Sequence, residues 1–404
     1  MIKSVLIANR GEIAIRIART ARRMGIKTYV VRTAKEPEAV YLSAADAVIN
    51  FPETDGNIPE FLDIDRLVGL AREYKIDSLH PGYGYLSENA ELAERCRDNG
   101  IVFIGPSPEV IRLMGDKVAA KGIAAQSGVP MLGASQGAVH TLDEARKIAK
   151  RLGYPVIIKA VSGGGGRGMR IVHHQDELEQ LYKIATAEAQ VAFNDPSVFI
   201  EKYLENPKHI EFQIVADNYG NVVHLGEREC SIQRKHQKLM EEAPSPALDE
   251  RLRKKMAAAA VSLAKQAGYQ SLGTVEFLLD HQKHFYFMEM NTRIQVEHPV
   301  TEEITGIDLV ELQFNIAAGR KLPLRQSQIH LNGWSIECRI NAEDVQAGFS
   351  PSIGVIRQLR LPQGNHIRIE TGIAPGSEIT PFFDSMVAKL IVTGDTREQA
   401  IERT

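Results

Sequence analysis

The chain has 404 residues, of which 44% are hydrophobic and 25% charged, and its formal net charge is −3. This length corresponds to roughly two to three domains of ordinary size, and the composition argues against a disordered chain. The near balance of charges gives no electrostatic reason to expect nucleic acid or an anionic membrane as a partner. Three widely separated cysteines form no CxxC pair, so neither a disulfide framework nor a zinc site is expected. The first apolar run is too short for a signal peptide or a membrane span, which predicts a cytoplasmic protein.

Strands and helices alternate in the first part of the chain. Short apolar runs predict strands at 4–9, 27–32 and 45–49, and apolar periodicity predicts helices at 13–24 and 64–74. This alternation favours an open, largely parallel sheet. Ligands of such sheets bind beyond the carboxyl ends of the strands. Asn9, Arg10 and the turn at 80–85 are expected there.

A second unit, from about 132 to 203, contains a glycine-rich run at 163–168 between two predicted strands, 154–161 and 169–173. Glycines allow the backbone to approach a phosphate closely and to turn its N–H groups inward. The run lacks the ending of a P-loop and the spacing of a Rossmann fingerprint. The unit is therefore predicted to be a hairpin flap, with phosphate binding and a merely flexible tip as the two alternatives for its loop.

The third part of the chain is antiparallel in character. Alternating residues around turn sequences predict two hairpins, 209–217 with 221–229 and 273–280 with 284–291. A long amphipathic helix is expected at 248–268, ending at a C-cap glycine. A last helix is expected from Thr396, and its position at the end of the sequence suggests a truncated C-terminal region.

Two glutamates face each other in the second hairpin. Glu276 and Glu289 lie on paired strands among apolar neighbours, and close cross-strand carboxylates repel unless a cation lies between them. With the amide oxygen of Asn291 they form a hard oxygen set suited to Mg²⁺ that bridges nucleotide phosphates. The alternative is a solvated pair on an exposed face.

The segment that follows carries a polar pattern. If 291–297 is extended, alternation places Asn291, Arg293, Gln295 and Glu297 on one face. The arginine can bind a small planar oxyanion through two hydrogen bonds, and the neighbouring carboxylate can act as a general base. A polar sheet edge is the alternative.

Other candidates are weaker alone. Lys159 ends a buried strand, where an ammonium is costly without an anion, and Lys117 begins a helix. A snorkelling surface lysine is the alternative for both. The charged run at 233–238 has the composition of a solvated loop, and neither His209 nor Arg339 is distinctive by itself.

Together these segments resemble the biotin carboxylase family of the ATP-grasp superfamily. The matching stretches occur in family order and span nearly the whole chain. They are 7–14 (IANRGEIA), 80–84 (HPGYG), 115–117 (GDK), the glycine run, 229–233 (ECSIQ), 236–238 (HQK), 289–301 and 381–389.

The resemblance implies a mixed α/β and α+β fold of several domains. A Rossmann-like N-terminal domain at 1–114 would precede an ATP-grasp domain at 115–320, whose lid lies at about 132–203, and a C-terminal subdomain at 321–404. It also implies ATP-dependent carboxylation of biotin with bicarbonate, with Mg²⁺ or Mn²⁺ as the metal. The biotin would be on a separate carrier, a carboxyltransferase would use the product, and a homodimer is expected.

The resemblance assigns roles to individual residues. Those implied to bind the nucleotide are Lys117, Lys159, Gly164, Gly165, Gly166, Glu201, Lys202, Leu204, His209, Gln233, His236 and Leu278. Those implied to bind the metal are Glu276, Glu289 and Asn291. Lys238, Arg293, Gln295 and the Val296 amide would hold bicarbonate, Glu297 would be its base, and Arg339 would stabilise the biotin enolate.

Two other functions remain open at this point. Another ATP-grasp ligase that forms an acyl phosphate, such as half of a carbamoyl phosphate synthetase, would share the lid, lysines and carboxylates. The segment from Arg293 to Glu297 favours the biotin carboxylase. An inactive ATP-binding scaffold is the second alternative, and the intact metal and base residues argue against it. The final carboxyl acceptor is not encoded in any of these motifs.

Overall fold

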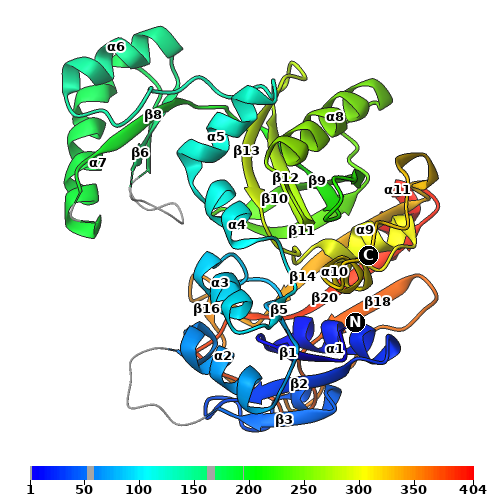
Figure 1. The fold of residues 1–404 in the computed structure, drawn as a ribbon. Coiled ribbons are helices and arrows are strands. Elements are labelled where there is room, and N and C mark those ends of the chain that lie inside the picture. The colour runs from blue at the N-terminus through cyan, green and yellow to red at the C-terminus, as the bar shows by residue number, and fades with distance from the viewer. Residues whose placement is uncertain (1, 52–58, 162–168, 194) are drawn as a thin grey trace.

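The computed structural model describes residues 2–51, 59–161, 169–193 and 195–404. Within these residues the strands form a five-stranded sheet, an eight-stranded sheet, a three-stranded sheet and two small ribbons. Figure 1 shows the five-stranded sheet at the bottom and the three-stranded sheet with its two helices standing apart at the upper left. The mixed α/β architecture expected from the sequence is confirmed.

The five-stranded sheet is parallel throughout and has the order β3-β2-β1-β4-β5. Its strands are β1 (Ser4–Ile7), β2 (Lys27–Arg32), β3 (Ala47–Asn50), β4 (Ser78–His80) and β5 (Val102–Phe103). Its helices are α1 (Gly11–Arg23), α2 (Ile64–Glu73), α3 (Ala90–Asp98) and α4 (Pro108–Gly115), with short 3-10 turns η1 (Val40–Ala44) and η2 (Glu60–Leu62). The predicted parallel sheet is confirmed, with most strand and helix ends within two residues of those expected.

The carboxyl ends of β1 and β4 are joined by side-chain hydrogen bonds. The Asn9 amide donates to the carbonyl oxygens of Pro81 at 2.8 Å and Tyr83 at 2.7 Å. Gly82 has φ +65°, and a Cβ there would lie 2.8 Å from the Asn9 amide nitrogen, so this turn requires glycine. Arg10 is ion-paired with Glu36. The sequence placed these residues correctly at the strand ends, where they hold the turn in place.

The three-stranded sheet forms a small separate body. Its order is β7-β6-β8, all antiparallel, with β6 (Val156–Ala160), β7 (Met169–Val172) and β8 (Val198–Lys202). Its helices are α6 (Leu142–Leu152), which begins with a capping box of Thr141 and Glu144, and α7 (Leu178–Phe193), preceded by η3 (Gln175–Glu177). The predicted hairpin is confirmed. Gly164, Gly165 and Gly166 lie outside the described residues.

The eight-stranded sheet has the order β13-β12-β9-β10-β11-β14-β20-β18 and is antiparallel. Its strands are β9 (Lys208–Ala216), β10 (Val222–Arg234), β11 (Gln237–Ala243), β12 (Ser271–Leu279), β13 (Phe285–Asn291), β14 (Trp334–Asn341), β18 (Ile367–Thr371) and β20 (Met386–Gly394). The associated helices are α5 (Lys117–Gln126), α8 (Glu250–Gln266), α9 (His298–Thr305), α10 (Leu309–Ala317) and α11 (Arg397–Arg403). Short elements complete the region: η4 (Gln326–Gln328), β15 (Glu343–Asp344), β16 (Ser350–Pro351), β17 (Gly354–Val355) and β19 (Glu378–Ile379). Both predicted hairpins are confirmed, and the sheet continues from them into the C-terminal part of the chain.

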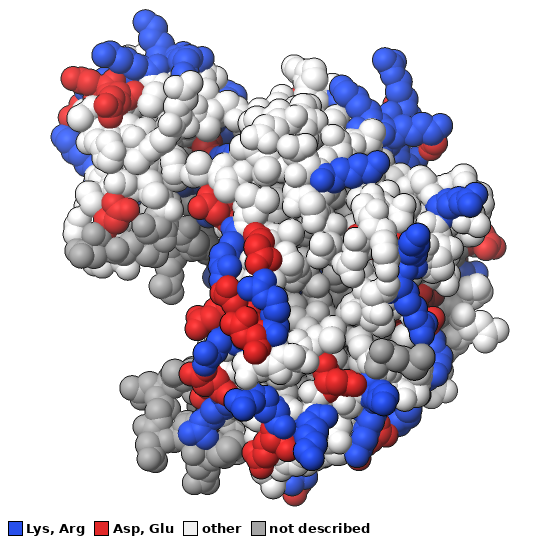
Figure 2. All heavy atoms as spheres, viewed as in Figure 1, with Lys and Arg blue, Asp and Glu red and all other residues white. Residues whose placement is uncertain are grey.

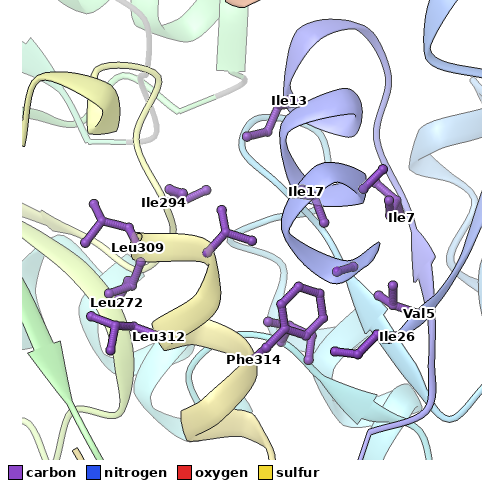
Figure 3. Close-up of a cluster of buried hydrophobic side chains, with 14 of the residues drawn as sticks. Val5, Ile7, Ile13, Ile17, Ile26, Leu272, Ile294, Leu309, Leu312 and Phe314 are labelled. Atoms are coloured by element: carbon purple, nitrogen blue, oxygen red, sulfur yellow. The ribbon is translucent and has the colours of Figure 1, made fainter. Parts of the chain in front are cut away.

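A buried apolar cluster joins the parallel sheet to the larger sheet. Figure 3 shows Ile13 and Ile17 of α1 facing Phe314 and Leu309 of α10, with Ile294 beside them. Ile17 and Ile294 are fully buried. Because Ile294 lies between Arg293 and Gln295 in sequence, this core anchors the backbone of the segment that carries the polar candidates.

Charges of both signs are mixed on the face of the molecule drawn in Figure 2, where lysine, arginine and acidic side chains are interspersed. Arg97 of α3 pairs with Glu109 of α4, and Arg112 of α4 pairs with Glu94 of α3. No helix within the described ranges is long and apolar enough to cross a membrane.

Candidate active site

A half-buried lysine contacts three carboxylates at the centre of the eight-stranded sheet. Lys238 of β11 donates to Glu211 of β9 at 2.6 Å, to Glu276 of β12 at 3.0 Å and to Glu297, just before α9, at 2.7 Å. Burial alone lowers the pKa of Lys238, but the three carboxylates together raise it well above its ordinary value. The ammonium therefore stays charged, and the lysine predicted from the resemblance lies at the middle of the cluster.

A second buried cation supports the same cluster. Arg228 of β10 is fully buried and donates to Glu211 at 2.5 Å. It also donates to Gln213 at 2.8 Å, Thr301 at 2.9 Å and Thr274 at 3.2 Å. Every one of these partners is buried, so the guanidinium is held rigidly by its hydrogen bonds. Sequence reasoning missed both Arg228 and Glu211, although alternation along β9 places Glu211 and Gln213 on one face.

The two predicted metal ligands are cross-strand partners. Glu276 pairs with Glu289 in the register of β12 and β13, and a register shift at Met288 follows directly. Such bulges occur often next to active sites because they re-aim a side chain. Glu276 is 3% exposed whereas Glu289 is exposed, so the pair is neither wholly buried nor wholly solvated. Desolvation of the Glu289 carboxyl and the charge of Glu276 raise the pKa of Glu289.

This arrangement fits a divalent cation. Glu276 is held by His209, whose Nε2 lies 2.7 Å from its Oε2, and by the Asn291 amide nitrogen at 2.8 Å. Within the described part of the chain, Glu289 makes no hydrogen bond or ion pair, so both of its oxygens remain available. The Asn291 side-chain oxygen accepts from Arg293 at 3.1 Å. The oxygens of Glu276 and Asn291 lie beside the Glu289 carboxylate, which forms no ion pair among the described residues. Oxygen ligands of this kind are those that Mg²⁺ prefers.

The predicted extended conformation of 291–297 is wrong. Strand β13 ends at Asn291, the chain bends at Arg293, Val296 and Glu297 form a turn, and α9 begins at His298 with Pro299 in its first turn. A proline is favourable at this helical position, which stops the strand pattern from continuing. The polar side chains nevertheless converge, because the buried Ile294 and the start of α9 fix the path of the chain.

The converging side chains contact one another and the carboxylate cluster. Gln295 donates to Glu276 at 3.0 Å, and Arg293 Nη1 lies 3.4 Å from the Gln295 side-chain oxygen. Arg293 also donates to Glu88 at 2.9 Å. Glu88, which follows the HPGYG turn and is absent from the sequence predictions, thereby ties the N-terminal part of the chain to the site. The carbonyl oxygen of Val296 accepts from the buried Lys389 at 2.7 Å.

Glu297 and Arg339 form the end of the cluster nearest the C-terminal strands. Arg339 of β14 lies 2.9 Å from Glu297 and 2.6 Å from Glu241 of β11. Burial works to raise the pKa of Glu297, but Lys238, Arg339 and Arg228 together hold it well below its usual range. The resemblance implied that Glu297 is the base and that Arg339 stabilises the biotin enolate, and it did not predict their direct contact. Sequence reasoning missed Glu241, because no local sequence pattern indicates that it contacts Arg339.

The described residues implied to bind nucleotide come mainly from the small sheet, from α5 and from strands β9, β10 and β12. Lys159 of β6 donates to Glu201 of β8 at 2.6 Å, and Lys121 of α5 contacts the same carboxylate. Burial favours a higher pKa for Glu201, but Lys159 and Lys121 lower it to about 2. Lys121 was missed by sequence reasoning. The side chain of Lys202 donates to the carbonyl oxygens of Gly153 and Tyr154, so it supports the small sheet.

The remaining candidates are more dispersed. His209 Nδ1 lies 2.9 Å from the Gln233 amide, and Leu278 is opposite His209 in the strand register. His236 is exposed in the β10–β11 turn with φ +66°. Lys117, at the start of α5, is exposed, and Leu204 is half-buried after β8. The run at 233–238 is the end of a hairpin rather than a loop.

Three family models match consecutive parts of the chain. The biotin carboxylase N-terminal domain matches residues 1–111, and the ATP binding domain of the carbamoyl-phosphate synthase L chain matches 116–325. The biotin carboxylase C-terminal domain matches 337–404. A biotin carboxylase from Nostoc sp. is 52% identical over 399 residues, which cover 99% of this chain and 89% of that protein. The chain belongs to the biotin carboxylase family.

Solved structures of this family have the same fold. A biotin carboxylase from Campylobacter jejuni in a β-γ-ATP complex superposes with a TM-score of 0.94 at 46% identity, covering 100% of this chain and 90% of that one. The biotin carboxylase domain dimer of the Hydrogenobacter thermophilus 2-oxoglutarate carboxylase, in complex with MgADP, ADP and bicarbonate, gives a TM-score of 0.93 at 49% identity. That match covers 100% of this chain and 88% of the other.

These findings decide between the alternatives left open by the sequence. The predicted family, the fold and the enzyme class, an ATP-grasp ligase of the biotin carboxylase type, are confirmed. The carbamoyl phosphate synthetase alternative is not supported, because biotin carboxylase models match on both sides of the shared ATP-binding domain. The roles of individual residues stay predictions.

Proposed function

We propose that this chain carboxylates biotin on a carrier protein, using ATP and bicarbonate, through the residues of the Lys238 cluster. The observation that carries the proposal is the convergence of Lys238, Arg293, Gln295, Glu297 and Arg339 beside the Glu276–Glu289 pair. Cations and an amide suited to a small oxyanion thus adjoin a carboxylate base and an oxygen-rich metal site.

The nucleotide binds between the three-stranded sheet and the eight-stranded sheet. Its phosphates lie near Lys117, Lys159 and the glycines Gly164, Gly165 and Gly166, and its base lies by the strand that carries Glu201. Lys202, Leu204, His209, Gln233, His236 and Leu278 complete its surroundings. Lys159 is already ion-paired with Glu201, so a phosphate would compete with that carboxylate for the ammonium. Glu276, Glu289 and Asn291 hold Mg²⁺ or Mn²⁺, which neutralises phosphate charge when bound.

Bicarbonate binds to Lys238, Arg293, Gln295 and the Val296 amide. Glu297 accepts its proton, and the resulting oxyanion attacks the γ-phosphate to give carboxyphosphate and ADP. Lys238 and Arg339 hold the pKa of Glu297 well below its usual range, which makes the carboxylate a weak base. An anion that shares these two cations raises the pKa of Glu297, so that substrate binding itself prepares the base. Carboxyphosphate then yields CO₂ and phosphate.

Arg339 acts in the second stage. Phosphate removes the proton from the biotin ureido nitrogen, and the guanidinium stabilises the enolate that attacks CO₂. The Arg339 side chain is 10% exposed and that of Lys238 is 13% exposed, so both cations can be reached from solvent, whereas Glu297 between them is fully buried. A charge-assisted contact in a partly enclosed site is strong enough to stabilise such an anion.

The domain division and the partners follow from the same assignment. We propose domains at 1–114, 115–320 and 321–404, with the lid at about 132–203. The partners are a biotinylated carrier and a carboxyltransferase component, and the chain forms a homodimer, as the Hydrogenobacter domain does. A cytoplasmic location stays a prediction from the sequence.

Calorimetry and a coupled assay test the function. ATP should bind in the presence of Mg²⁺, and ADP release should then depend on bicarbonate. Adding free biotin should give carboxybiotin. ATP binding without bicarbonate-dependent hydrolysis would indicate an inactive nucleotide-binding module. Bicarbonate-dependent hydrolysis that never carboxylates biotin would indicate a ligase for another acceptor.

A further inference from the structure

Two further carboxylates lie beneath Arg339, and the proposed reaction does not use them. Glu241 of β11 and Glu337 of β14 are direct cross-strand partners, so their side chains share one face of the sheet. Glu241 is 1% exposed and Glu337 is fully buried. Arg339, two residues beyond Glu337 on the same strand, also lies on this face. Two acids and a guanidinium thus form one buried group.

The hydrogen bonds within this group are unequal. Arg339 Nε donates to Glu241 Oε1 at 2.7 Å. The other oxygen of Glu241 and both oxygens of Glu337 are buried with no hydrogen-bond partner among the described residues. Leaving three carboxylate oxygens unsatisfied in this way is costly if both groups are ionised. A single proton placed between the two acids removes one charge and supplies a donor.

The surroundings do not supply enough positive charge for two anions. Arg339 is shared with Glu297, and Lys389 of β20 lies 3.0 Å from Glu12 and donates to the Val296 carbonyl. Burial raises the pKa of Glu241 to about 7 although Arg339 acts to lower it, and burial raises the pKa of Glu337 well above its ordinary value although Lys389 acts to lower it. The charge of Glu297 adds to the rise of both. The titratable and charged groups that face the pair are Lys238 on β11, Arg339 on β14, Lys389 on β20, Glu297 before α9, Cys230 on β10 and Tyr83 in the turn after β4. Cys338 lies on the opposite face of β14, where burial and the charges of both acids raise the pKa of its thiol.

We propose that Glu241 is a positioning residue that fixes the Arg339 guanidinium for the biotin stage, and that Glu337 shares a proton with it so that the pair carries one negative charge. With both acids ionised, Arg339 would face three carboxylates and keep little attraction for a biotin enolate. When the Glu241–Glu337 pair keeps one proton, Glu241 still orients the Arg339 guanidinium. The guanidinium then keeps enough positive charge to attract the biotin enolate. The inference rests on the proposed role of Arg339.

The first experiment compares Glu241→Gln with Arg339→Ala. ADP and carboxybiotin are measured in one reaction. Glu241→Gln should keep most bicarbonate-dependent ADP release while carboxybiotin formation falls by about tenfold or more, as expected when a charge-assisted hydrogen bond is lost. The KM for biotin should rise while the KM for ATP does not. Glu242→Gln is the matched control, because Glu242 is on the same strand but pairs with Arg397 and Trp334, and its ratio of products should match the parent's.

The two variants separate the possible failures. If Arg339→Ala loses ADP and carboxybiotin together, the proposed role of Arg339 is wrong whatever Glu241 does. If Arg339→Ala loses only carboxybiotin and Glu241→Gln keeps the parent's ratio of products, the positioning role of Glu241 is overturned. A general loss of structure would lower both products equally in Glu241→Gln, and it would likewise overturn the specific role.

The shared proton has its own test in Glu337→Gln. An acid whose pKa is raised by folding stabilises the protein at low pH and loses that contribution as pH rises from its unfolded value toward its folded value. Glutamine cannot ionise, so the variant escapes this loss. The melting temperature of Glu337→Gln minus that of the parent should therefore increase with pH from mildly acidic to mildly alkaline buffer. A difference that stays constant across this range would show that Glu337 holds no extra proton, and would overturn the proposal.

Discussion

The five-stranded parallel sheet and the eight-stranded antiparallel sheet place their polar residues in different ways. In the parallel sheet the strands are apolar, and polar groups such as Asn9 and His80 collect where strands end. In the antiparallel sheet, charged residues such as Glu211, Arg228 and Glu276 are in the middle of strands and wholly enclosed. A parallel sheet covered on both faces can bind ligands only at its edge. An antiparallel sheet can carry reactive side chains on one of its faces, and the face that carries Glu211, Arg228 and Glu276 is called the charged face below.

The two regions also depend on different forces. Apolar packing between α1 and α10 is nondirectional, and each side chain contributes a modest share. In the charged face Arg228, Lys238 and Arg339 are each paired with buried carboxylates, so removing one of them leaves its partners uncompensated in a buried site. We therefore expect substitutions in the charged face to cost much more, in activity or stability, than conservative changes in the apolar interface.

The largest expected effect concerns the base. Glu297→Gln should lose bicarbonate-dependent ADP release and biotin carboxylation together, by roughly 10²–10⁴-fold, the usual cost of removing a general base. Arg339→Ala should lose carboxylation while keeping much of the ADP release, because its role comes after carboxyphosphate has formed. Measuring both products in one reaction distinguishes the variants. Normal hydrolysis in Glu297→Gln would mean that another group takes the proton.

The next effect is on stability. Arg228→Met leaves Glu211 short of its closest partner in a fully buried site, where breaking an ion pair costs roughly 3–5 kcal/mol. Denaturant titration should show this loss, and the additional change Glu211→Gln should restore part of it. Arg97→Met removes a surface pair with Glu109 and should cost at most about 1 kcal/mol. Similar losses for both arginines would contradict the distinction drawn between the enclosed face and the surface.

The metal site gives a smaller and more specific effect. Glu276→Gln and Glu289→Gln should each raise the Mg²⁺ concentration needed for half-maximal ADP release by about tenfold or more, because a neutral amide is a poor ligand. Glu276→Gln should also weaken bicarbonate dependence, since Glu276 contacts Lys238, whereas Glu289→Gln should not. Glu250→Gln, an exposed control on α8, should leave the Mg²⁺ response unchanged. An unaltered Mg²⁺ response in Glu289→Gln would remove that residue from the metal site.

The sequence predicted the parallel sheet and the hairpins well because their signals are local. Short apolar runs and turn residues act within a few residues. The pairing of Glu276 with Glu289 was also predictable, since one short turn joins their strands. The bulge at Met288 and the turns after Asn291 were not, because they depend on how Ile294 and α9 pack.

The charged face was only partly predictable for a related reason. Lys238 and Glu297 are 59 residues apart in sequence, and Arg339 and Glu241 are 98 apart. Such contacts leave no periodic signal, so Glu211, Arg228, Glu241 and Lys121 were missed. The resemblance supplied Lys238, Glu297 and Arg339, but not the residues that hold them in place.

The smallest expected effect is in the apolar interface. Ile17 is fully buried where α1 meets α10 (Figure 3), and Ile17→Val removes one methylene group from this contact. The expected loss is about 0.5–1.5 kcal/mol in the free energy of unfolding, with both products of the reaction unchanged. Ile401→Val, at a half-exposed position on α11, should change neither quantity. The same interface anchors Ile294 beside Arg293 and Gln295, however. A change in its packing can therefore move these two polar side chains through Ile294. If Ile17→Val lowered bicarbonate-dependent ADP release while stability stayed within this range, the apolar interface would be setting the geometry of the charged face rather than only supporting it.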